Sequence, residues 1–213
     1  METQGCIRTR RSIRKYKDKP VEWDKIVQIV NAANFAPSAG NLQNWKIIVV
    51  KNDIGRKKLA AAAFNQEWME VAPIHMVVIA EPNNGEQFYG ARGARLYTIQ
   101  NCAAVIQNIL LTANDCGLGS CWVGAFDEDL VRRALQLQED VSPQAIITIG
   151  YADEHPEMPS RKRLEHQVYI DRWMGRKASP FGAIGYTSVM MKDALENTKK
   201  AIHRAGRNLV KER

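Results

Sequence analysis

The chain has 213 residues, of which 45% are hydrophobic and 25% are charged, and its formal net charge is +7. This composition excludes a disordered chain, a collagen and a small disulfide scaffold. No stretch of about 18 uninterrupted apolar residues is present, and the segment METQGCIRTRRSIRKYK has no apolar signal core. We therefore expect a cytoplasmic protein without membrane association.

The positive charge is concentrated towards the two ends of the chain. Residues 7–25 contain eight basic and three acidic residues, and residues 161–213 contain thirteen and five, whereas the segment between them is mildly acidic. This distribution indicates either one polyanion site built from both ends or a nucleic-acid-binding surface. A solvated surface is the simpler explanation, and for the last twenty residues it is the preferred one.

Apolar periodicity predicts alternating helices and strands. Helices are expected from Trp23 to just before Pro37, from Asp53 to Phe64, from Tyr97 to Asn114 and from Asp127 to Leu135, and strands over 46–50, 74–80, 120–123 and 145–151. The helix over 97–114 is apolar on nearly every face, which indicates burial within a domain or between subunits.

The order of these elements bears on the fold class. No strand–GxGxxG–helix unit is present, which argues against a dinucleotide-binding Rossmann fold and favours a mixed α+β sheet. We expect one domain over residues 1–178, followed by a basic and helical C-terminal extension over residues 179–213. His75 lies in the apolar strand 74–80 and is expected in the core.

Two segments contain side chains suited to a phosphate group. Arg10, Arg11, Ser12 and Arg14 combine guanidinium groups with a hydroxyl, and the basic triplet 161–163 could complete the same anion site. Taken singly, each basic cluster is more typical of a solvated surface.

Two further segments are suited to a planar ligand. Residues 37–45 (PSAGNLQNW) combine small residues, which allow close approach to the backbone, with amide edges for a heterocycle. Residues 117–124 (GLGSCWVG) could expose backbone N–H groups and bring Trp122 near a ring system. Taken singly, residues 37–45 are better explained as a polar connecting loop, and a tight turn beside a buried tryptophan explains residues 117–124 equally well.

In this order and spacing, the segments RRSIRKY, APSAGNLQNWKIIVV, FNQEW, APIHMVVIA, GLGSCWVGAF and PSRKRL resemble the nitroreductase family of FMN-dependent oxidoreductases. The resemblance implies an α+β fold with a mixed, mainly antiparallel sheet flanked by helices, in an interlocked homodimer with FMN at the interface. It also implies NADH or NADPH as the electron donor and nitroaromatics, quinones or activated alkenes as small acceptors. The implied mechanism is ping-pong hydride transfer at flavin N5, with no catalytic side chain and no metal.

The resemblance also assigns cofactor-binding residues. Arg10, Ser12, Arg161 and Arg163 are expected at the FMN phosphate, with Arg11 there or facing solvent; Arg14 at the flavin N1–C2=O edge; Asn65 at the pyrimidine edge; Val123 and Gly124 near N5; and Pro37, Ser38, Ala39 and Asn41 in a loop that packs under the ring bound by the partner subunit.

Further expectations concern a lid segment, one cysteine and two alternative functions. The segment from Glu81 to Arg95 is short and contains Gly85, Gly90 and Gly93, which favours a short, flexible lid over a permissive site. Cys121 is expected near the flavin, where a packed thiol is preferred to a redox-active one. Flavin binding without turnover, for storage or sensing, is one alternative function. A basic nucleic-acid-binding module is the other, although no nucleic-acid motif supports it.

Overall fold

The computed structural model describes residues 2–162 and 166–175. These residues form two compact units, one ending at Met158 and one beginning at Pro159, and each is described by itself. The expected C-terminal extension over 179–213 lies outside the described residues, as does Arg163. The domain boundary at residue 178 therefore stays a prediction.

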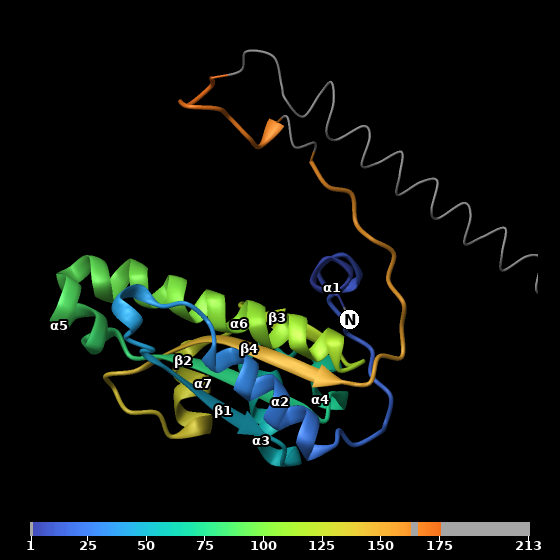
Figure 1. Cartoon of the computed structure of the whole chain (residues 1–213). Coiled ribbons are helices and arrows are strands. Elements are labelled where there is room, and N and C mark those ends of the chain that lie inside the picture. Colours follow the sequence, from blue (N-terminus) through green and yellow to red (C-terminus); the bar gives the residue numbers. More distant parts are fainter. Residues whose placement is uncertain (1, 163–165, 176–213) are drawn as a thin grey trace, which may run out of the picture. The chain divides into compact units, whose positions relative to one another are not determined.

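The first unit is built on a four-stranded sheet (Figure 1). Its strands are β1 (Trp45–Val50), β2 (Ile74–Ala80), β3 (Gly119–Val123) and β4 (Ser142–Gly150). They lie in the order β1-β2-β4-β3, and each strand pairs antiparallel with its neighbour. The strands expected from runs of valine and isoleucine are all present, and the predicted α+β class with a mainly antiparallel sheet is confirmed.

Helices cover both faces of this sheet (Figure 1). On one face, α2 (Trp23–Asn34) and α6 (Thr98–Asp115) pack against side chains of β2 and β4. On the other face lie α3 (Asp53–Ala62), α4 (Trp68–Val71) and α7 (Glu128–Leu135). Burial of apolar side chains on both faces explains why β2 has no exposed residue.

Helix α6 is the long apolar helix expected over 97–114, but a single chain does not bury all of it. Its Ile106 and Ile109 are buried against the sheet, whereas Ile99 is 49% exposed and Gln107 is also exposed. The short N-terminal helix α1 (Thr3–Thr9) packs near its end, where Asn114 Nδ2 donates to the Cys6 carbonyl over 3.2 Å. None of the described helices is both long enough and apolar enough to cross a membrane.

The segment expected as a flexible lid is helical. It forms α5 (Pro82–Arg92) and a π-helical turn, η2 (Gly93–Tyr97), that leads into α6. Gly85 and Gly93 allow these two elements to touch, because a Cβ atom on Gly93 would lie 2.0 Å from the Gly85 carbonyl oxygen. Two of the three glycines thus serve close packing, and Gly90 has a backbone conformation (φ 60°, ψ −158°) that glycine tolerates.

The buried His75 makes the stability of the fold depend on pH. Its side chain is fully buried in β2, its Nε2 lies 2.8 Å from the Met69 carbonyl oxygen, and burial lowers its pKa to about 4. In the unfolded chain the pKa is near its ordinary value of about 6.5, so the unfolded state binds the proton first as the pH falls. We expect the free energy of unfolding to fall by about 3 kcal/mol between pH 6.5 and pH 4 from this residue alone.

Denaturant unfolding at several pH values in this range measures the effect, with His75→Gln as the reference because glutamine does not titrate. The variant should lose less stability than the wild type on acidification. Parallel pH profiles of the two proteins would contradict the assignment.

Candidate functional site

The basic N-terminal segment lies along β3. Ser12 forms an isolated parallel bridge with Ser120, and the Ile13 N–H donates to the Ser120 carbonyl oxygen over 3.0 Å. The next two residues are held by Glu154, whose carboxylate accepts the backbone N–H groups of Arg14 and Lys15. The residues expected at a phosphate are therefore held on an edge of the sheet.

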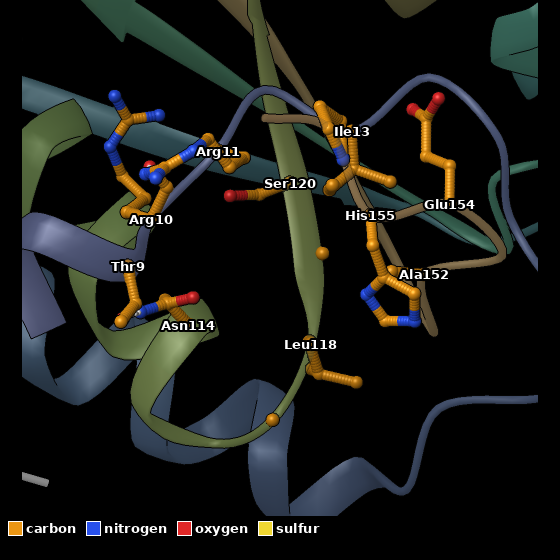
Figure 2. A pocket seen from close by; sticks show the side chains of 13 residues that line it. Thr9, Arg10, Arg11, Ile13, Asn114, Leu118, Ser120, Ala152, Glu154 and His155 are labelled. Carbon is orange, nitrogen blue, oxygen red and sulfur yellow. Dashed lines mark hydrogen bonds between the residues drawn. The ribbon is translucent and has the colours of Figure 1, made fainter. Parts of the chain in front are cut away.

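A pocket of about 340 Å³ opens between this segment, the end of α6 and the start of β3 (Figure 2). Its lining combines polar and apolar residues and consists of Thr9, Arg10, Arg11, Ile13, Asn114, Gly117, Leu118, Gly119, Ser120, Ala152, Glu154, His155 and Pro156. Figure 2 shows Arg10 and Arg11 on one rim, with the Ser120 side chain directed from β3 towards that side.

Two buried polar atoms at this pocket have no hydrogen-bond partner among the described residues. They are Ser120 Oγ, on a side chain that is only 2% exposed, and Arg11 Nε. Buried polar groups are nearly always paired, so two orphaned donors beside one pocket point to an absent acceptor. The Arg11 guanidinium itself is anchored, because its Nη1 donates to the carbonyl oxygens of Arg8 (2.7 Å) and Arg10 (2.8 Å).

The charge of the pocket favours an anion. Arg10 and Arg11 contribute two permanent positive charges. The one carboxylate in the lining, Glu154, already accepts the two backbone N–H groups noted above. The donor set suits a group with several acceptor oxygens, such as a phosphate.

A second group of predicted residues lies beyond this pocket. Arg14 is exposed, and its guanidinium carbon lies 5.9 Å from the centre of the Trp68 ring. Trp68 follows the turn that contains Asn65 in the sequence. That turn is joined to the segment after β3, because the Asp127 N–H donates to the Ala62 carbonyl oxygen over 2.8 Å. Val123 is buried and Gly124 is exposed at the end of β3.

Cys121 is a packed residue in this region. It is 2% exposed, and burial raises the pKa of its thiol, although Arg14 and the Ser12 side chain act in the opposite direction. A thiol with a raised pKa stays protonated near neutral pH and is not an activated nucleophile. Among the described residues, no group of three or more His, Cys, Asp or Glu side chains could hold a metal ion.

The loop over residues 37–41 contacts the end of α6 opposite to the pocket of Arg10 and Ser120. The Ala39 N–H donates to Oδ1 of Asn101, near the start of α6, over 3.0 Å. The pocket of Arg10 and Ser120 instead includes Asn114, near the end of the same helix. Asn101 and Asn114 are 13 positions apart, which corresponds to about 20 Å along a helix. Within one chain, this loop therefore does not lie next to the pocket of Arg10, Arg11 and Ser120, which we call the phosphate-type pocket.

The remaining predicted residues are at the C-terminal side. Arg161 belongs to the second unit, where it is exposed and donates to the Pro159 carbonyl oxygen over 3.4 Å. Arg163 is not described.

The sequence prediction missed Ser120 and Asn101. Ser120 stands inside the glycine-containing segment 117–124, but its role depends on the register between β3 and the Ser12 segment. Asn101 lies in α6, which also contains the amide side chains of Gln100, Gln107, Asn108 and Asn114, so nothing in the sequence singled it out.

The model of the nitroreductase family matches residues 7–66 and 60–151 of the chain. A relative from Methanothermobacter thermautotrophicus, whose name pairs NADH dehydrogenase with NAD(P)H nitroreductase, is 35% identical over 178 residues, covering 81% of this chain and 88% of the relative. The NADH dehydrogenase of Thermus thermophilus is 32% identical over 195 residues, covering 79% of this chain and 95% of that protein.

The fold is similar to solved structures as well. The FMN-dependent nitroreductase of Clostridium difficile R20291 superposes with a TM-score of 0.68 at 28% sequence identity. The match covers 80% of this chain and all of the other chain.

Proposed function

The chain belongs to the nitroreductase family, which makes it an NAD(P)H-dependent oxidoreductase with FMN as its cofactor, and we propose that it reduces small acceptors such as nitroaromatics, quinones or activated alkenes. When bound, FMN supplies the hydride chemistry, so the chain needs side chains that bind and orient rather than a catalytic acid or base.

One observation carries the placement of the cofactor: the pocket with the orphaned donors Ser120 Oγ and Arg11 Nε. Both atoms, together with the Arg10 guanidinium on the rim, fit the oxygens of the FMN phosphate. In this proposal Ser12, Arg161 and Arg163 complete the phosphate site.

The other predicted residues would face the ring system. Arg14 would lie at the N1–C2=O edge, where a cation favours the negatively charged reduced flavin. Asn65 would pair with the pyrimidine edge, and the backbone of Val123 and Gly124 would approach N5. The turn of Asn65 and the end of β3 are joined by the Asp127–Ala62 hydrogen bond, which supports this grouping.

We propose that the active form is a homodimer with FMN at the interface. The loop over 37–41 and the phosphate-type pocket lie at opposite ends of α6, so a second copy is needed to bring both types of contact to one flavin. Two surfaces support such pairing. Ile99 is exposed on α6, and a mainly apolar groove of about 570 Å³ runs between α2 and β1, an edge strand of the sheet. Mass measurement in solution, with and without residues after about 186, tests both the dimer and the part of the C-terminal extension in it.

Initial-rate kinetics test the enzymatic proposal. If donor and acceptor use the same space above the flavin in turn, rates measured against NADH or NADPH at several acceptor concentrations give parallel double-reciprocal lines. Intersecting lines would contradict the ping-pong order. Binding of FMN without any oxidation of NADH or NADPH would instead favour a storage or sensing role. The expected cytoplasmic location stays a prediction.

A further inference from the structure

The loop between α2 and β1 has an unusual backbone. Gly40, Asn41 and Gln43 all have positive φ angles, of 56°, 56° and 47°. Two of these residues are not glycine, so the conformation costs free energy and persists only where the surroundings hold it. Part of that support is local, because the Ser38 hydroxyl accepts the Gln43 N–H over 3.1 Å.

A buried amide provides further support. Asn101, which is 5% exposed, accepts the Ala39 N–H at Oδ1 over 3.0 Å. Its Nδ2 donates to Oδ1 of the fully buried Asn44 over 2.8 Å. Both ends of the Asn101 amide are thus paired, which fixes its orientation and that of the Ala39 backbone.

The same network reaches the start of α6. Asn44 Nδ2 donates to the Thr98 hydroxyl over 2.7 Å, and that hydroxyl donates to the Gly93 carbonyl oxygen over 2.8 Å. These buried polar groups stand beside the apolar core, since their sequence neighbours Trp45 and Cys102 belong to it. Burying a polar network there costs desolvation free energy that an apolar set would avoid, which indicates that the defined loop geometry matters.

We propose that Asn101 is a positioning residue for the cofactor. By holding Ala39, it keeps the loop over 37–43 in the shape in which that loop meets FMN. The inference rests on the proposed function, in which this loop packs under the flavin of the partner subunit. Asn101 of one copy therefore adjusts the site completed by the other, without touching the flavin itself.

A matched pair of variants separates this role from simple stabilisation of the fold. Asn101→Leu removes both amide hydrogen bonds, whereas Thr98→Val removes two other buried hydrogen bonds of the same network and leaves the link to Ala39 in place. We expect both variants to unfold at lower temperature. Only Asn101→Leu should weaken FMN binding, by about tenfold, and change the visible circular dichroism of the bound flavin.

Equal FMN affinity and equal flavin spectra in the two variants would overturn the inference and leave the network a purely structural role. If Asn101→Leu does not fold, Asn101→Ala and Thr98→Ala form the corresponding pair, with the same expected difference. A wild-type chain that binds no FMN would overturn the proposed function, and the inference with it. Normal FMN binding by wild type and both variants would overturn the inference alone.

Discussion

Replacing Arg10 and Arg163 together by alanine is expected to weaken the free energy of FMN binding by at least about 3 kcal/mol. Each arginine is assigned one charge-assisted contact to the phosphate, and such hydrogen bonds contribute roughly 1.5–3 kcal/mol each. Arg10 lines the pocket that contains the orphaned Ser120 hydroxyl, whereas Arg163 is assigned from the sequence alone. Equilibrium titration of the apoprotein with FMN gives the affinity directly.

The control for this experiment is Lys58→Ala combined with Arg133→Ala. It removes the same charge from exposed positions on α3 and α7, the helices on the other face of the sheet. The control should bind FMN like the wild type at moderate salt. If the Arg10 and Arg163 variant retains flavin through gel filtration as well as the control does, the phosphate site is misplaced.

Gly93→Ala is expected to have the largest effect on the fold. A Cβ atom at this position would lie 2.0 Å from the Gly85 carbonyl oxygen and 2.8 Å from Cβ of Tyr89, so the backbone of α5 or η2 must move. Overpacking of this kind costs about 3 kcal/mol, and a clash with backbone is not relieved by a rotamer change. We expect a loss of about 3 kcal/mol in the free energy of unfolding, measured by denaturant titration.

Ala91→Ser is the matched control, because it adds one heavy atom at an exposed position of α5, two residues before Gly93. It should unfold within about 0.5 kcal/mol of the wild type, as surface substitutions generally do. Wild-type stability in Gly93→Ala would mean that α5 and η2 are not packed as described.

The regular elements could be predicted because their sequences are locally unambiguous. The runs over 46–50 and 74–80 are rich in valine and isoleucine, and both form strands within one residue of the expected bounds. Helix α1 could not be predicted, because its seven residues contain little periodicity. Contacts with α6 support it, including the Cys6 thiol on the Leu111 carbonyl oxygen at 3.1 Å.

The segment from Glu81 to Arg95 shows the limit of reading composition alone. Its three glycines suggested flexibility, yet Gly85 and Gly93 permit a close helix contact that only the folded structure reveals. The same limit applies at the site. The basic and glycine-containing segments could be recognised as motifs, but the Ser120 hydroxyl becomes relevant only through its pairing opposite Ser12.

The central claim is that this chain holds FMN and reduces it with a pyridine nucleotide. The most direct test is the absorbance spectrum of the purified protein, recorded without oxygen before and after addition of NADH or NADPH. We expect two flavin bands that bleach on addition of one of these donors and return with a nitroaromatic, quinone or activated-alkene acceptor. A colourless protein that also leaves added FMN unbound would contradict the cofactor, the site and the activity together.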